Sequence, residues 1–384
     1  MVKAYVVCAV ALIVFLGSCA ILAQAEQAAV PKEAKATVES TAARTTAAAS
    51  EETPPRGKLK WRVDMGQEGE STPVVEDGTL YQGLKRSLVA LDAATGRKKW
   101  VFHTGAGVCG TPVVAEGKVF FSINDYGPTG GSRPQIFAYY ALDAATGKQL
   151  WMRNSDIEPP TGGMAVVDAV VYVAGGLWGN GAINALDAQT GGDVWEFRLD
   201  DYPSIRLTVA DGAVYFGDYS KVLYALDAKT GLKKWSRLGL GCAPAVLGDT
   251  LFAARRNELC AAGTDNGRAK WTFPTGSPVT TIPTVSDGAL YFANKKGTLF
   301  AISAADGKEK WHCEIGPEAG EAVVAGDGVY CNTNAHFTAY ALDIETGRKK
   351  WFFNTGDYMP HGVAVANGVV YFTSGKYLYA VEAK

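Results

Sequence analysis

Short runs of apolar residues alternate with polar turns along most of the chain, and the same order returns repeatedly. One unit contains, in order, Val74-Val75, Asp77-Gly78, Thr79-Leu80-Tyr81 and Leu88-Val89-Ala90-Leu91. Asp-Gly between two β-prone runs predicts a tight hairpin, because glycine supplies the positive φ that such turns require. The pattern therefore predicts units of four short antiparallel strands.

Each unit ends in a similar string, ALDAxTGxxxW. The string is complete at 90–100, 141–151, 185–195, 225–235 and 341–351, and it is degenerate at 261–267 and 301–307. Its aspartate predicts an Asx turn and its glycine a strained turn position before the strand that carries the tryptophan. The structural tryptophans are Trp61, Trp100, Trp151, Trp195, Trp235, Trp271, Trp311 and Trp351. Self-similarity at a period of about 40 residues is typical of propellers and solenoids.

The units must pack against one another, because a sheet with two apolar faces cannot bury both alone. The last unit ends at Lys384 without another TG or tryptophan, whereas residues 58–63 have the pattern of an outer strand. We therefore predict an all-β, eight-bladed propeller over residues 58–384, built from four-stranded antiparallel blades. The N-terminal outer strand at 58–63 closes the ring and removes an open edge.

Residues 1–25 predict export, and three interpretations of them stay open. Leu16-Gly17-Ser18-Cys19 resembles a lipobox, in which Cys19 is lipidated, and Ala23-Gln24-Ala25 resembles a cleavage site. The apolar run Ala4–Ala23 is also long enough to anchor the chain in a bilayer without cleavage. All three place the protein outside the cytoplasm, at the periplasmic face of a bacterial membrane or secreted.

Residues 26–57 consist mainly of Ala, Thr, Glu, Lys and Pro, and their few large apolar residues cannot offset the entropy of ordering. We expect a flexible tether between membrane and propeller.

Composition narrows the function. The chain has 37 basic and 39 acidic residues, which predicts no nucleic-acid partner. Four histidines show no metal-ligand spacing, so no metal site is predicted. Beyond the signal region there are five cysteines, at 109, 242, 260, 313 and 331, and an odd number cannot form a complete disulfide framework.

The repeat A-x-D-x-x-T-G-x-x-x-W over residues 58–384 resembles the quinoprotein-type, or PQQ-like, β-propeller repeat. That family includes quinone-dependent dehydrogenases and the propeller lipoprotein of the outer-membrane β-barrel assembly machinery, which is the more similar in length and features. Its catalytic members are longer, with segments that wall the quinone pocket and bind calcium, and they commonly carry two adjacent cysteines that this chain lacks.

The resemblance favours a membrane-tethered scaffold for protein–protein interaction with a role in outer-membrane protein assembly. We then expect no catalytic residue and no cofactor. The alternative is a small dehydrogenase with pyrroloquinoline quinone and calcium at the propeller axis. A carbohydrate-binding protein is a third possibility. In each case we expect a monomeric propeller.

The two faces of the predicted propeller differ. The Asp-Gly hairpins and the TG corners lie on one face, where the sequence varies little between units; we call it the TG face. The loops between the second and third strands lie on the opposite face, together with the connections between blades. We call it the loop face, and it carries the irregular sequences. Irregular loops on a rigid scaffold are typical binding sites, so we expect protein partners there. The binding-face candidates are Glu70, Asp125, Tyr126, Arg133, Trp178, Arg206, Arg255, Arg256, Glu321, His336 and His361.

Alignment of the units on their apolar pairs predicts a ring around the axis at the loop face. Its members are Glu70, Cys109, Gly163, Arg206, Cys242, Thr281, Glu321 and His361. Arg206, Glu321 and His361 either hold a polar ligand or an ion pair, or are solvated at a wet funnel. Trp178 departs from the regular spacing and is either a contact anchor or a local plug.

Overall fold

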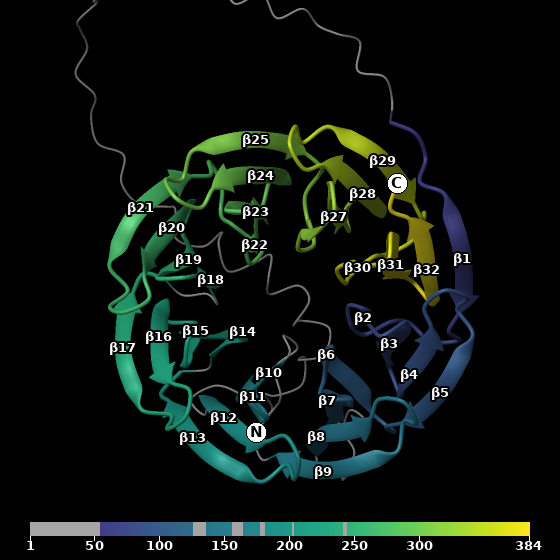
Figure 1. The fold of residues 1–384 in the computed structure, drawn as a ribbon, viewed down its shortest axis with the longest axis horizontal. Coiled ribbons are helices and arrows are strands. Elements are labelled where there is room, and N and C mark those ends of the chain that lie inside the picture. Colours follow the sequence, from purple (N-terminus) through teal and green to yellow (C-terminus); the bar gives the residue numbers. More distant parts are fainter. Residues whose placement is uncertain (1–53, 126–135, 156–163, 177–180, 202, 241–243) are drawn as a thin grey trace, which may run out of the picture. The chain divides into compact units, whose positions relative to one another are not determined.

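The computed structural model describes residues 54–125, 136–155, 164–176, 181–201, 203–240 and 244–384. All of them belong to one compact unit. They form eight four-stranded antiparallel sheets and contain no helix, which confirms the predicted eight-bladed β-propeller. Figure 1 shows the sheets around a common axis, with the first strand of each blade near the centre and the fourth at the rim. In this part of the chain there is accordingly no helix long and apolar enough to cross a membrane.

The blades follow the order of the chain. Blade 1 contains β2 (Val74–Glu76), β3 (Thr79–Leu84), β4 (Ser87–Asp92) and β5 (Lys98–His103). Blade 2 contains β6 (Gly107–Ala115), β7 (Lys118–Asp125), β8 (Ile136–Asp143) and β9 (Gln149–Ser155). Blade 3 contains β10 (Met164–Val167), β11 (Val170–Gly175), β12 (Gly181–Asp187) and β13 (Asp193–Leu199). Blade 4 contains β14 (Pro203–Ala210), β15 (Ala213–Asp218), β16 (Val222–Asp227) and β17 (Lys233–Leu238).

The second half of the ring has the same plan. Blade 5 contains β18 (Ala245–Leu247), β19 (Thr250–Arg255), β20 (Glu258–Gly263) and β21 (Ala269–Pro274). Blade 6 contains β22 (Thr284–Ser286), β23 (Ala289–Ala293), β24 (Thr298–Ser303) and β25 (Glu309–Glu314). Blade 7 contains β26 (Val323–Ala325), β27 (Gly328–Thr333), β28 (Thr338–Asp343) and β29 (Lys349–Asn354). Blade 8 contains β30 (Ala364–Ala366), β31 (Val369–Ser374), β32 (Tyr377–Glu382) and β1 (Leu59–Asp64).

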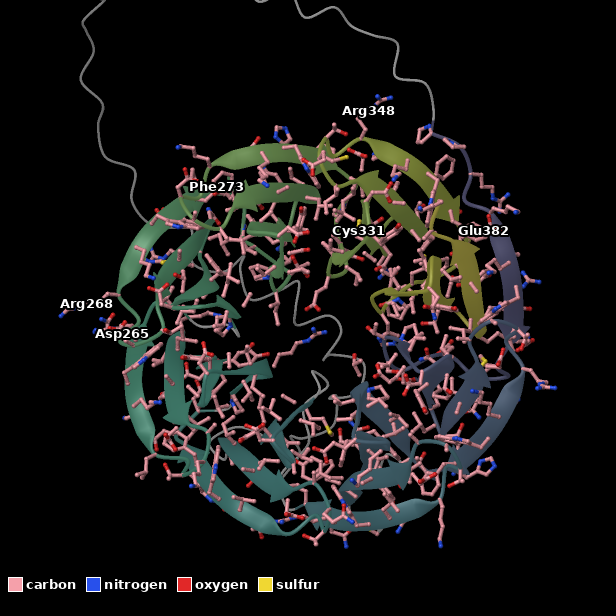
Figure 2. The ribbon with its side chains drawn as sticks, viewed as in Figure 1. Asp265, Arg268, Phe273, Cys331, Arg348 and Glu382 are labelled. Carbon is pink, nitrogen blue, oxygen red and sulfur yellow. The ribbon has the colours of Figure 1, made fainter. Side chains whose placement is uncertain are left out.

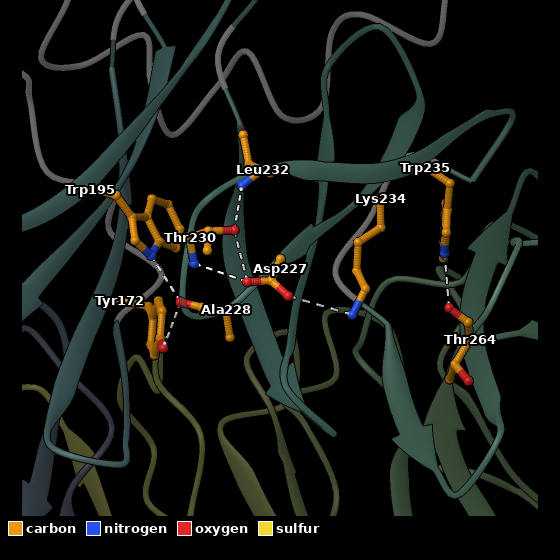
Figure 3. Close-up of polar contacts among 9 residues, drawn as sticks. All are labelled: Tyr172, Trp195, Asp227, Ala228, Thr230, Leu232, Lys234, Trp235 and Thr264. Carbon is orange, nitrogen blue, oxygen red and sulfur yellow. Dashed lines mark hydrogen bonds and ion pairs between the residues drawn. The ribbon is translucent and has the colours of Figure 1, made fainter.

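The repeated string forms a hairpin corner whose contacts are local. In blade 4 the Asp227 carboxylate accepts hydrogen bonds from the Thr230 amide and hydroxyl, at 2.9 and 2.8 Å (Figure 3). Gly231 has a φ of 72°, a left-handed conformation that glycine adopts without steric cost. The other complete copies repeat the carboxylate contacts at Asp92–Thr95, Asp143–Thr146, Asp187–Thr190 and Asp343–Thr346. The recurring aspartate and threonine therefore have a structural role.

Each corner also receives the tryptophan of the preceding blade. The Trp195 indole donates to the Ala228 carbonyl at 2.8 Å, and the Tyr172 hydroxyl donates to the same oxygen at 3.1 Å (Figure 3). A Cβ on Gly231 would lie 2.7 Å from the Trp195 ring, so the glycine also makes room for the indole. The tryptophans therefore join consecutive blades, as the repeat predicts.

The predicted ring closure is confirmed, and both ends of the chain contribute to it. β1 pairs antiparallel with β32 and completes blade 8. The Trp351 indole donates to the Ala383 carbonyl, while a Cβ on Gly57 would lie 2.9 Å from the Trp351 ring. Gly57 thus fills the place that the TG glycine fills in other blades. It also donates its amide to the Phe352 carbonyl at 2.8 Å, so the last residue of the predicted tether packs against the propeller.

The packing between blades alternates around the ring, which the sequence analysis did not predict. Blades 1 and 2 meet through a triad of Phe102, Phe121 and Tyr140, in which Phe121 and Tyr140 stack at a centroid distance of 5.1 Å. Equivalent triads join blades 3 and 4, blades 5 and 6, and blades 7 and 8; their members are Phe197, Phe216 and Tyr224; Phe273, Phe292 and Phe300; Phe353, Phe372 and Tyr379. The propeller is therefore built from four two-blade units.

The junctions between these units have smaller or polar residues at these three positions, except that Tyr340 matches the tyrosine of three triads. They are Val63, Gln82 and Val89; Arg153, Val173 and Asn184; Arg237, Ala253 and Cys260; Cys313, Cys331 and Tyr340.

Candidate functional site

The loop face collects the ends of strands two and four and the connections between blades. In blades 1–7, strand four follows the corner after strand three, so it runs from the TG face to the loop face. In blade 4, β17 therefore carries Leu232, just before its start, to the TG face and Leu238 to the loop face. Residues that follow strand four, such as Glu70 and Glu321, lie in the connections at the loop face.

Strand pairing shows that the eight residues aligned around the axis do not occupy one position. Thr208 and Val323 are equivalent, since both pair with the tyrosine of strand two, and Arg206 and Glu321 each lie two residues earlier. His361 lies three residues before its equivalent, Ala364. The alignment was wrong in this respect because the connections between blades differ in length. In blades 8 and 1 the position of Arg206 is held by Gly362 and Thr72, and the Gly362 amide donates to the Thr72 hydroxyl at 3.1 Å.

Arg206 and Glu321 form an ion pair across the axial opening. The Arg206 Nη1 donates to Glu321 Oε2 at 2.5 Å, although blade 4 and blade 7 are separated by two whole blades. Their side chains are 38% and 34% exposed. An ion pair this exposed typically contributes about 0–1 kcal/mol, because solvent screens it and two long side chains lose entropy. It is therefore a weak, solvent-accessible polar link between blades 4 and 7.

His361 and Glu70 lie where blade 8 meets blade 1. The His361 Nε2 lies 3.0 Å from the Gly69 carbonyl, which can only accept, so Nε2 carries the proton. Burial lowers the pKa of His361, which favours the neutral imidazole. Burial also raises the pKa of the half-buried Glu70 carboxyl, while Lys85 opposes this shift. These two side chains are thus partly buried where blade 8 meets blade 1.

The other described candidates are spread over the loop face. Asp125 is a half-buried residue at the end of β7, Arg255 ends β19, and Arg256 occupies the following turn with a φ of 52°. His336 is exposed in the turn after β27, where its ring packs against Gly316. Cys19, Tyr126, Arg133 and Trp178 lie outside the described residues, as do Gly163 and Cys242.

An exposed apolar and basic patch on blades 4 and 5 contains two of the predicted binding-face candidates, Arg255 and Arg256, together with three residues that were not predicted. We call it the blade 4–5 patch; its residues are Tyr219, Lys221, Leu238, Arg255 and Arg256. Leu238 is 81% exposed, the largest fraction for any large apolar side chain described. The Gly239 amide donates to the Lys221 carbonyl at 2.6 Å, and a Cβ on Gly239 would lie 4.0 Å from Arg255, so the residues adjoin. The repeat carries a signal for Leu238, because the third residue after the structural tryptophan is polar or proline in the other copies; these are Asp64, His103, Asn154, Arg198, Pro274, Glu314 and Asn354.

Metal binding was tested against the donor set. Among the residues that the structure describes, no three His, Cys, Asp or Glu side chains are grouped so that they could hold a metal ion.

The blades, their tryptophan corners and their closure define a β-propeller of the quinoprotein type. A family model described as outer membrane protein assembly factor BamB matches residues 46–130, 138–247 and 237–383. The chain therefore belongs to the BamB family of propellers.

Relatives in sequence fall into different functional classes. The chain is 27% identical over 199 residues to outer membrane protein assembly factor BamB of Moranella endobia, covering 48% of this chain and 47% of that protein. It is 29% identical over 243 residues to the dehydrogenase subunit of the quinone alcohol dehydrogenase of Gluconacetobacter polyoxogenes, covering 56% of this chain and 30% of that subunit. The chain thus spans less than half the length of either relative.

Solved structures support the fold. BamB from Moraxella catarrhalis superimposes with a TM-score of 0.67 at 16% identity, covering 85% of this chain and 99% of that one. Quinohemoprotein alcohol dehydrogenase from Comamonas testosteroni gives a TM-score of 0.66 at 16% identity, covering 85% and 76%.

Proposed function

We propose that the protein is an exported, membrane-tethered propeller that docks a protein partner on its loop face during outer-membrane protein assembly. The observation that carries this proposal is the blade 4–5 patch, where Leu238 is 81% exposed and the next residue, Gly239, adjoins Lys221 and Arg255. Leucine next to tyrosine and arginine offers apolar area together with charged donors, and tyrosine and arginine are enriched at the centres of protein interfaces. Family membership agrees with a role in assembly.

The proposed tether fits this arrangement. β1 is the fourth strand of blade 8, so Leu59 lies toward the TG face and Asp64 toward the loop face. Residues 54–58 therefore reach the propeller at the TG face, away from the proposed docking patch. A membrane anchor preceding them leaves the loop face accessible to a partner.

Partner capture tests the proposal with two matched substitutions in blade 4. Leu238→Ser removes the apolar anchor from the loop face, whereas Leu232→Ser removes a leucine that is 70% exposed at the TG corner. In-cell crosslinking followed by mass spectrometry should show about a tenfold loss of the captured partner for Leu238→Ser, the scale of a hot-spot residue. Leu232→Ser should capture as much as the unmodified protein. Equal capture by both variants would refute docking at this patch.

A second candidate function is quinone-dependent dehydrogenation, which is favoured by relatives such as the alcohol dehydrogenase subunit of Gluconacetobacter polyoxogenes. Two features of the described residues argue against that cofactor with its calcium. These residues offer no grouped metal ligands, and the Arg206–Glu321 pair crosses the axial mouth. Addition of pyrroloquinoline quinone and calcium to the purified protein, with absorbance and dye reduction recorded, distinguishes the candidates. A quinone spectrum with dye reduction would overturn the scaffold proposal.

A further inference from the structure

Two facing positions meet at each interface between blades. One is the second residue after the tryptophan on strand four, and the other follows the aromatic residue of strand two in the next blade. At four interfaces these positions hold phenylalanines whose ring centroids lie 6.0–6.4 Å apart; the pairs are Phe102–Phe121, Phe197–Phe216, Phe273–Phe292 and Phe353–Phe372. Side chains at the two positions therefore point toward each other across the interface.

Between blades 6 and 7 the same two positions hold Cys313 and Cys331. Cys313 is the second residue after Trp311 on β25, and Cys331 follows Tyr330 on β27. Both pack in one apolar cluster with Trp311 and Tyr340. Each thiolate also adds to the raised pKa of the Tyr340 hydroxyl, which is due first to burial. The repeat position and the shared neighbours thus place the two cysteines opposite each other across the interface between blades 6 and 7.

The two cysteines differ in access. Cys331 is fully buried, and Figure 2 shows it inside the ring of outer strands. Cys313 is partly exposed on the outermost strand of blade 6, where its thiol donates to the Glu314 carbonyl at 3.9 Å. A reagent from solution therefore meets Cys313 first.

We propose that Cys313 and Cys331 form a dithiol that closes to a disulfide between blades 6 and 7 on reaction with a disulfide oxidant. The Cys313 thiolate attacks one sulfur of the oxidant, which releases the first oxidant thiol and leaves a mixed disulfide at Cys313. The Cys331 thiolate then attacks the Cys313 sulfur and releases the second oxidant thiol. The cysteine pair loses two electrons and two protons, and the oxidant gains both.

The second step sets the rate at neutral pH. Burial, with a smaller contribution from Cys313, raises the pKa of the Cys331 thiol to about 12. Only the thiolate attacks, so the rate of closure should rise about tenfold for each pH unit between pH 7 and 9. The mixed disulfide at Cys313 should therefore accumulate at pH 7 and convert at pH 9.

Mass spectrometry tests the proposal on the full chain. The protein is incubated with oxidised glutathione at pH 7 or pH 9, quenched with acid, unfolded, alkylated and digested with trypsin. No lysine or arginine lies between Trp311 and Gly347, so both cysteines fall in the peptide 311–348. At pH 9 this peptide should carry no alkyl group and be lighter than the reduced peptide by two hydrogen atoms. Two alkylated cysteines, or a glutathione adduct that persists at pH 9, would overturn the proposal.

Variants separate the pair from other thiols. Cys313→Ser should abolish both the adduct and the bridge, and Cys331→Ser should stop the reaction at the adduct. Cys260→Ser is the matched control, because Cys260 is buried at a junction whose facing residues are Arg237 and Ala253, and it should bridge normally. Since the unmodified chain already reports the bridge, a folding defect in a variant does not decide the result. Oxidation should also raise the thermal midpoint of the unmodified chain and leave that of Cys313→Ser unchanged; a Cys313→Ser midpoint that rises equally would contradict an inter-blade link.

Discussion

Individual aspartates in the repeat act as acceptors that fix the blade corner. Asp227 accepts two hydrogen bonds from Thr230 and lies 3.9 Å from the Lys234 ammonium (Figure 3). The Thr230 hydroxyl and amide lower the pKa of Asp227, with smaller contributions that include Lys234. Threonine likewise lowers the pKa of Asp92, Asp143, Asp187 and Asp343. Because the folded pKa of each group is below its unfolded value, ionisation stabilises the folded state.

Acid should therefore weaken the propeller through these corners. Their contribution is complete above the unfolded pKa of aspartate, about 3.9, and it is lost as the pH falls through the lower folded pKa values. We expect Asp227→Asn to lower the thermal midpoint at pH 7 and to make its fall below pH 4 shallower than in the unmodified protein. Asp287→Asn is the control, because Asp287 occupies a hairpin turn at φ 46° that asparagine tolerates. A parallel fall in both variants would show that the corner carboxylate does not matter.

The inner hairpins show how one element depends on its turn. Five of them pair a non-glycine residue at positive φ with a glycine at positive φ; the turns are Asp77-Gly78, Glu116-Gly117, Asp211-Gly212, Asp287-Gly288 and Asn367-Gly368. Blade 3 instead has Asp168-Ala169, with φ values of 51° and 58°. The register from Val167↔Val170 onward is regular, so the strands impose the conformation on the alanine. This turn is a strained site in an otherwise consistent element.

Replacement of Ala169 should relieve that strain. A left-handed conformation costs a non-glycine residue about 1–2 kcal/mol, and glycine costs only about 0.4–1 kcal/mol in added unfolded-state entropy. Ala169→Gly should therefore stabilise the protein by about 1 kcal/mol in urea unfolding. The reverse change, Gly212→Ala, should cost a similar amount, because nothing lies within 4 Å of its added Cβ and only the backbone is strained. A loss of stability in Ala169→Gly would disprove the account.

The strands could be predicted from the sequence because their signals are local. Alternating apolar residues, Asp-Gly turns and the TG corner each act within a few residues, and all eight blades follow from them. The Arg206–Glu321 contact could be predicted only in part: the repeat alignment named both residues as able to form an ion pair, but not that they pair with each other, since they lie 115 residues apart. Leu238 could have been identified from the repeat, because the equivalent position in every other copy holds a polar residue or proline.

At the scale of the whole molecule, two kinds of interface between blades alternate around the ring. Aromatic triads fill the interfaces within each two-blade unit, whereas the junction between blades 4 and 5 has Arg237, Ala253 and Cys260 at those positions. Aromatic pairs contribute about 0.5–1.5 kcal/mol beyond their buried area, so the interfaces within a unit should be the stronger ones. The sequence repeats most clearly about every 40 residues, which is one blade. The alternation repeats every two blades and changes only three positions per blade, so it is difficult to see in the sequence.

Splitting the chain at a junction should therefore be tolerated better than splitting it inside a unit. A cut after Leu240, between β17 and β18, leaves every triad within one fragment. A cut after Ser277, between β21 and β22, separates Phe273 from Phe292 and Phe300 and exposes apolar rings on both fragments. For both cuts, β1 lies in one fragment and β32 in the other, so the two fragments still meet in blade 8. The two fragment pairs therefore differ only in the interface at the cut. Coexpressed fragments cut after Leu240 should copurify in higher yield, measured by affinity capture and size-exclusion chromatography; equal yields would mean that the paired blades are not units of assembly.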